Sequence, residues 1–203
     1  MSAEPNQRLR TGPDGVRRCW WCGDDPLYVD YHDLEWGRPA DDDVRLFEKL
    51  CLEGFQSGLA WITVLRKRPA FRTAFADFDP AQVARFTAGD VERLVADAGI
   101  IRHRGKIEST INNAQRALEM IDEHGSIHAY VSRYRTERRR RLSVDDELPA
   151  TSAESVALSK DLKRKGWTFV GPTTVYSFMQ AMGLVDDHLD GCFVEVTALP
   201  STR

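Results

Sequence analysis

The sequence lacks the features that mark membrane or exported proteins. No stretch of its 203 residues approaches the roughly 20 consecutive apolar residues that a membrane-spanning helix needs. Residues 1–18 have no apolar core, so we expect no secretory signal, no membrane and a cytoplasmic location. In a cytosolic chain a disulfide framework is not expected. The four cysteines are therefore expected either to bind a metal or to be buried as free thiols. They are Cys19, Cys22, Cys51 and Cys192.

An excess of positive charge is also absent. Lys and Arg number 28 against 31 Asp and Glu, for a formal net charge of −3. That balance argues against a surface coated with positive charge for nucleic acid, but it leaves room for local basic patches, which are what phosphate binding needs. The proportions of hydrophobic residues (42%) and charged residues (29%) are those of an ordinary globular protein.

Sustained alternation of apolar and polar residues is missing as well, and there is no internal repeat. Apolar residues recur instead at helical spacing, which predicts an all-α fold. We expect a flexible tail over 1–18, one domain over 19–196 and a second tail over 197–203. The expected helices cover 41–65 (divided by Gly54 and Gly58), a short stretch opened by Asp79 and Pro80, 90–98, 105–125, 126–135, 152–165 and 173–184.

The segment LVADAGIIRHRGKI, residues 94–107, combines two helices, a short link and positive charge. Gly99 can end the first helix in a left-handed conformation, and Gly105 lets the backbone of the second helix approach an external group. A helix N-terminus presents unpaired N–H groups that bind anions such as phosphate. The pattern fits a DNA-binding helical hairpin over about 90–107 and, equally well, an ordinary hairpin with a solvated basic turn.

Cysteine and histidine occur near both chain ends. Cys19 and His32 lie near the start, and His188 and Cys192 form H-x3-C near the end. Two thiolates and two imidazoles suit tetrahedral zinc. Cys22 competes with Cys19 as a ligand, and a distant H-x3-C also occurs at plain helix ends.

A carboxylate lies close to a dense group of aromatic residues. Glu53 shares a helical face with Leu46 and Leu50, and a buried Glu needs a partner or a function. Local pairing of Glu53 and a structural role for the aromatics are the alternatives. The arginine run Arg138–Arg141 indicates either a solvated face or an auxiliary DNA contact.

Four segments resemble the 3-methyladenine DNA glycosylase I family of the helix-hairpin-helix glycosylase superfamily. They are DPLYVDYHDLEWGRP (25–39), LFEKLCLEGFQSGLAWITVLRKR (46–68), DVERLVADAGIIRHRGKI (90–107) and FVGPTTVYSFMQAMGLVDDHLDGC (169–192). The resemblance runs in order from about Cys19 to about Cys192. It implies a two-lobed all-α fold with the active site in the cleft, a helix-hairpin-helix motif and one structural zinc that joins the two chain ends.

The resemblance also implies roles for individual residues. The zinc ligands become Cys19, His32, His188 and Cys192, with Cys22 a bystander. Leu59 falls where the family pushes a residue into the gap left by a flipped nucleotide. The residues expected to hold DNA are Gly99, Ile101, Arg102, Gly105 and Lys106. The base pocket is expected at Glu53 and Tyr31, which are the candidate essential residues, and at Trp61, Tyr28 and Trp21.

The implied reaction is hydrolysis of the bond between 3-methyladenine and its sugar in double-stranded DNA. The methyl group gives the base a positive charge, which aromatic faces and a carboxylate attract. No lysine is evident as a nucleophile, so we expect a monofunctional enzyme that leaves an abasic site. We also expect the enzyme to be a monomer. The alternatives are a non-catalytic zinc-containing DNA-binding protein and a glycosylase with a broader range of alkylated purines.

Overall fold

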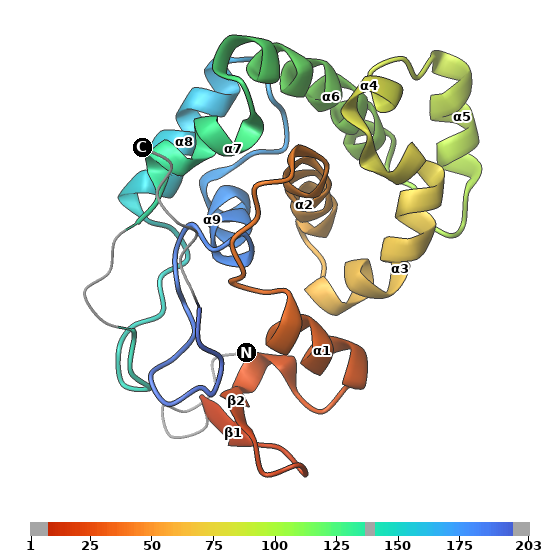
Figure 1. Cartoon of the computed structure of the whole chain (residues 1–203). Coiled ribbons are helices and arrows are strands. Elements are labelled where there is room, and N and C mark those ends of the chain that lie inside the picture. The colour runs from red at the N-terminus through yellow and green to blue at the C-terminus, as the bar shows by residue number, and fades with distance from the viewer. Residues whose placement is uncertain (1–7, 137–140, 197–203) are drawn as a thin grey trace. The chain divides into compact units, whose positions relative to one another are not determined.

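The computed structural model describes residues 8–136 and 141–196, and this part of the chain is mainly helical (Figure 1). It divides into two compact units, as a two-lobed fold predicts. Unit 1 takes in the chain up to Pro39, Arg135–Ala150 and the residues from Met179 onward, and unit 2 takes in Ala40–Tyr134 and Thr151–Phe178. None of the helices in the described residues has the length and apolar composition to span a membrane.

Unit 1 begins with a small antiparallel hairpin. Its strands β1 (Leu9–Thr11) and β2 (Arg17–Cys19) pair with Leu9 opposite Cys19. All of the hairpin except Cys19 falls inside the predicted tail over 1–18, so an all-α description omits one element. Strands of three residues are too short to show a period of two, and for this reason the sequence did not indicate them. The tail predicted over 197–203 lies outside the described residues.

A short 3-10 turn, η2 (Trp20–Cys22), leads from the hairpin to helix α1 (Pro26–Leu34). Asp25 caps this helix, because its carboxylate accepts the N–H groups of Leu27 and Tyr28, and Pro26 occupies the first turn, where no N–H is needed. Helical spacing then puts Tyr28 and His32 on one face of α1.

Unit 2 is built around α2 (Asp43–Gln56), which packs against α3 (Trp61–Ala74), α6 (Arg104–His124) and α7 (Ile127–Val131) (Figure 1). Asp42 caps α2 through the N–H groups of Val44 and Arg45. The predicted break at Gly58 is confirmed, since its φ of +85° is left-handed. Gly54 is not a break: it lies inside α2, where a Cβ would stand 3.4 Å from that of Phe169.

The remaining predicted helices are also present. The helix expected over 126–135 is α7 followed by the 3-10 turn η4 (Ser132–Tyr134). The cap predicted for the helix over 90–98 was wrong by three residues: Thr87 is the N-cap, and Asp90 completes a capping box with it. The other elements are η3 (Ala76–Phe78), α4 (Pro80–Val83), α5 (Ala88–Ala96), α8 (Ala153–Arg164) and α9 (Pro172–Ala181).

Candidate active site and metal centre

Four side chains with metal-binding atoms meet in unit 1, and they are the four that the sequence predicted: Cys19, His32, His188 and Cys192. Their ligand atoms all lie within 4.8 Å of one another, and all four residues are buried. Cys192 Sγ lies 3.6 Å from His32 Nε2 and 3.7 Å from His188 Nδ1. Sulfur and nitrogen ligands of one tetrahedral zinc stand about 3.6 Å apart, given the usual bond lengths. The group can therefore hold a metal ion.

The outer nitrogen of each imidazole has an acceptor that fixes the ring. His32 Nδ1 lies 2.7 Å from Asp33 Oδ1, and His188 Nε2 lies 3.1 Å from the carbonyl oxygen of Trp36. Both partners can only accept, so these nitrogens donate and leave the other nitrogen of each ring for a metal. Gly37 makes room for this arrangement, because a Cβ there would stand 2.9 Å from His188 Nε2.

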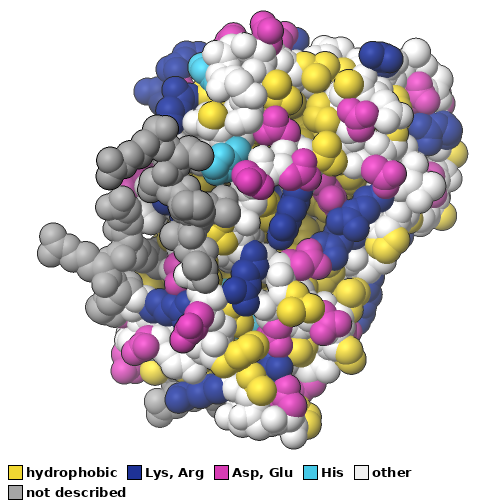
Figure 2. Space-filling model, in the orientation of Figure 1, with side chains coloured by type: hydrophobic (Ala, Val, Ile, Leu, Met, Phe, Trp, Pro, Cys, Tyr) yellow, Lys and Arg dark blue, Asp and Glu magenta, His cyan; other side chains and the backbone are white. Residues whose placement is uncertain are grey.

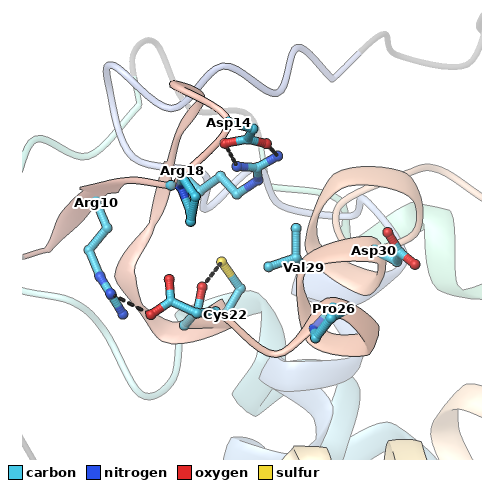
Figure 3. Close-up of a pocket in the computed structure, with 11 residues that line it drawn as sticks. Arg10, Asp14, Arg18, Cys22, Pro26, Val29 and Asp30 are labelled. Carbon is cyan, nitrogen blue, oxygen red and sulfur yellow. Dashed lines mark hydrogen bonds and ion pairs between the residues drawn. The ribbon is translucent and has the colours of Figure 1, made fainter.

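A buried arginine extends this network away from the metal-binding atoms. The Arg18 guanidinium makes paired hydrogen bonds to Asp33, at 2.9 and 2.8 Å, and to Asp14, at 3.0 and 2.7 Å. Arg18 lowers the pKa of Asp14 to about 2 through these bonds. Figure 3 shows the Arg18–Asp14 ion pair. Both residues line a hollow with a volume of about 260 Å³, at which Arg10 also pairs with Asp24. The network links the β1–β2 hairpin to α1, the two elements that carry Cys19 and His32.

The two thiols of the cluster differ in acidity. A hydrogen bond from Cys19 lowers the pKa of Cys192, whereas the negative sulfur of Cys192 and burial raise the pKa of Cys19. Cys22 does not belong to the cluster. Its thiol donates to the carbonyl oxygen of Cys19 at 3.2 Å.

Aromatic residues of unit 1 gather next to the cluster. The ring centroid of Trp21 lies 5.1 Å from that of Tyr28, 6.3 Å from that of Tyr31 and 4.9 Å from that of Trp36. Trp36 also packs edge-on against His188, with 4.6 Å between centroids. Three of the predicted base-pocket residues, Trp21, Tyr28 and Tyr31, thus form one aromatic group.

The other two predicted pocket residues, Glu53 and Trp61, meet in unit 2 through a lysine. Glu53 on α2 is only 4% exposed, and its Oε1 lies 2.7 Å from the Nζ of Lys49, one helical turn earlier. The same ammonium lies 3.3 Å from the ring centroid of Trp61, the first residue of α3. A carboxylate and an indole face therefore bind one cation together.

Leu59 lies in the turn between α2 and α3 and is 39% exposed. The side chain of Gln56 holds this turn by donating to the carbonyl oxygen of Leu59 at 2.6 Å, while the Leu59 N–H donates back to the carbonyl oxygen of Gln56. The buried ammonium of Lys106 donates to the carbonyl oxygens of Phe55 and Ser57 at 2.8 and 2.7 Å. Lys106 was predicted to add surface charge for DNA; the structure places this charge under the turn that carries Leu59, and burial lowers its pKa.

The predicted helical hairpin is formed by α5 and α6, which pack together. The link between them is held from α3, because Lys67 Nζ donates to the carbonyl oxygens of Ala98 and Gly99 at 3.0 and 3.1 Å. Gly99 does not adopt the left-handed conformation that we expected. A glycine fits there because a Cβ would stand 2.9 Å from Asp97 Oδ1 and 3.1 Å from the Cβ of Ala70.

At the start of α6, the His103 side chain accepts the N–H of Lys106 at 3.2 Å. Arg102 is exposed, Ile101 is half-buried, and Arg104 pairs with Glu92 at 2.8 Å. Basic and acidic side chains are interspersed on the face shown in Figure 2, in line with the small net charge. Of the arginine run, Arg138–Arg140 lie outside the described residues, and Arg141 pairs with Asp186.

Comparison with known proteins identifies the family. The family model described as methyladenine glycosylase matches residues 21–195. The chain belongs to this family. The DNA-3-methyladenine glycosylase 1 of Escherichia coli (strain K12) is 50% identical over 179 residues, which cover 87% of this chain and 96% of the relative.

Solved structures of methyladenine glycosylases share the fold. A crystal structure of 3-methyladenine DNA glycosylase I aligns with a TM-score of 0.81 at 49% identity, over 87% of this chain and 98% of the other. A variant of 3-methyladenine DNA glycosylase I in complex with 3-methyladenine aligns with a TM-score of 0.79 at 38% identity, over 83% of this chain and 92% of the other.

Within this methyladenine glycosylase, sequence reasoning missed the residues that surround the predicted ones. Lys49 was available as a lysine four residues before a buried glutamate, which is the spacing of a helical ion pair. Asp33 follows a predicted ligand directly, and carboxylates commonly orient metal-binding histidines. Arg18 carried no such signal, because the strand that positions it was not expected.

Proposed function

We propose that this chain is a DNA glycosylase that hydrolyses the N-glycosidic bond of 3-methyladenine in alkylated double-stranded DNA and leaves an abasic site. The observation that carries the proposal is the cation held between Glu53 and Trp61. Methylation at N3 gives the adenine of a nucleotide a positive charge as well, and a carboxylate together with an indole face is the arrangement that attracts it. Family membership and the solved complex with 3-methyladenine support the same reading.

Recognition in this proposal depends on charge and stacking. The Glu53 carboxylate accepts hydrogen bonds from the donor edge of the adenine, and Trp61 stacks on its face. Tyr28, Tyr31 and Trp21 remain predicted base contacts, as the resemblance implies. The glycosidic bond of the methylated nucleotide is already weakened, because the departing base leaves neutral, so little general acid is required. Water then attacks C1′ of an oxocarbenium-like sugar, and we assign no residue to orient it.

Access to the base requires the nucleotide to leave the duplex, which costs a few kcal/mol and less at a damaged pair. In our proposal the backbone from Gly99 to Gly105 holds phosphate, and Leu59 fills the vacated stack. Lys106 joins these two functions, because it lies in the first turn of α6 and supports the turn of Leu59. It acts as a positioning residue and not as a phosphate ligand.

We propose zinc as the metal of the Cys19, His32, His188 and Cys192 cluster, because two thiolates and two imidazoles at tetrahedral spacing suit this ion. Four protein ligands leave no open position for a reacting water, so the metal's part is structural. It ties the hairpin and α1 to the segment that follows α9.

The rival functions predict different products from methylated duplex DNA. Our proposal predicts abasic sites without strand breaks and no covalent adduct on borohydride treatment, since it assigns no lysine as a nucleophile. Strand breaks or an adduct would show a lyase instead. DNA binding without abasic sites would show the non-catalytic zinc-containing protein.

A further inference from the structure

Lys49 occupies the place that the proposed function gives to the substrate base. Lysines are almost never fully buried unless they are paired, yet Lys49 is only 6% exposed. Its ammonium makes the two contacts already described, with the carboxylate of Glu53 and the face of Trp61. These are the two groups to which the methylated adenine is assigned above.

A base and this ammonium cannot use the same indole face together. Stacked aromatic groups lie about as far apart as the 3.3 Å that separates the Lys49 nitrogen from the ring centroid of Trp61. An entering base must therefore move the ammonium away, and in doing so it separates Glu53 from its counter-ion. A buried carboxylate without a partner is strongly disfavoured. A cationic base supplies a new partner, and neutral adenine does not.

We propose that Lys49 is a specificity-determining residue: a resident cation that covers Trp61 and neutralises Glu53 until a methylated base displaces it. The inference rests on the proposed function of Glu53 and Trp61. Lys49 then weakens the binding of every base, but it excludes neutral adenine most, because only a charged base restores the ion pair that is lost.

Nuclear magnetic resonance of the full chain tests the displacement directly. The indole ring current should shift the Lys49 ε-protons strongly upfield in the free protein, and the signal is assigned by its loss in Lys49→Gln. Saturating 3,9-dimethyladeninium, whose N9-methyl group preserves the positive charge that the methylated base carries in DNA, should return the signal to its ordinary position. Neutral 9-methyladenine at the same concentration should leave it shifted. A shift that persists with the cationic base bound would overturn the inference.

Binding measurements give a second test. Lys49→Met and Lys49→Gln should each bind 3,9-dimethyladeninium about tenfold more tightly, because no cation has to leave the indole face. The glutamine can still donate to Glu53, so it serves if the methionine variant fails to fold. Lys160→Met, which removes an exposed lysine on α8, should bind as the wild type does. Equal or weaker binding in the Lys49 variants would show a supporting role instead.

These outcomes separate the inference from the proposed function. If the wild type releases 3-methyladenine from DNA but the Lys49 variants bind the cationic base no more tightly, the inference is wrong and the function stands. If the wild type neither binds the cationic base nor releases 3-methyladenine from DNA, the assignment of Glu53 and Trp61 fails, and the inference fails with it.

Discussion

At the scale of single residues, Glu53 is tested by a substitution that keeps its size. Gln in its place loses the negative charge and turns an amide donor toward the donor edge of the adenine. A mismatched buried hydrogen bond costs about 1–3 kcal/mol, so Glu53→Gln should lower the rate of 3-methyladenine release by about tenfold to a hundredfold.

Glu48→Gln is the matched control for this change. Glu48 is also buried on α2, but its carboxylate pairs with Arg72 at 2.9 Å. Glu48→Gln should keep the wild-type release rate, even if both substitutions lower the thermal midpoint of unfolding. Equal loss of activity in both variants would mean that Glu53 matters only for the helix.

Some properties of the site residues could be predicted from the sequence, and others could not. Burial of Glu53 followed from its helical face with Leu46 and Leu50, and the structure confirms it. The spacing of four residues offered Lys49 as the partner, but the burial of Lys49 did not follow, because a lysine is expected at the surface and its contact with Trp61 comes from another helix. Contacts between helices are not encoded in local spacing.

At the scale of elements, the start of α6 is tested by Gly105→Ala. A Cβ at this position would meet the His103 ring at 3.4 Å, an ordinary contact, so the fold should accept it. The free energy of unfolding should rise by about 0.5–1 kcal/mol, because alanine favours a helix over glycine. Affinity for DNA of any sequence should fall about tenfold if a backbone contact to phosphate is lost.

Gly89→Ala provides the comparison, since Gly89 lies in the first turn of α5 and a Cβ there meets only the Thr87 hydroxyl within 4 Å, at 3.5 Å. It should stabilise the protein similarly and leave DNA affinity unchanged. A change of sequence preference in Gly105→Ala, or no change in affinity, would refute the phosphate assignment.

The link between hairpin and α1 is tested through Asp33. Removal of its carboxylate in Asp33→Ala takes away the acceptor for His32 Nδ1 and one of the two carboxylates described above that pair with Arg18. Zinc affinity, measured by competition with a chelating dye, should fall about 10- to 100-fold. Asp30→Ala removes the same charge from an exposed position on α1 and should bind zinc as the wild type does. Unchanged affinity in Asp33→Ala would show that the ring needs no such support.

Elements with strong local signals were predictable, and short ones were not. The division of α2 from α3 followed from Gly58, and the end of α6 from Gly125, whose φ is +83°. Helix α1 was missed although Asp25 and Pro26 repeat the signal that correctly placed α4 after Asp79. The hairpin carries three residues per strand and gave no periodic pattern.

At the scale of the whole molecule, the metal site should dominate stability, because it closes a loop from Cys19 to Cys192. We expect one zinc per chain by metal analysis. An ion present at a thousand times its dissociation constant adds about 4 kcal/mol, so a strong chelator should lower the thermal midpoint by roughly 10 °C. His188→Ala should purify without zinc, whereas Cys22→Ala should retain it. Loss of zinc in Cys22→Ala would contradict the ligand set.

Identifying the base that the protein releases tests its proposed function most directly. Duplex DNA treated with a methylating agent is incubated with wild-type protein, and the soluble bases are separated and identified by mass. We predict that 3-methyladenine is released and undamaged adenine is not. Methylated DNA that is bound but yields no free base, or a release in which other methylated purines equal 3-methyladenine, would contradict the recognition of a cationic adenine by Glu53 and Trp61.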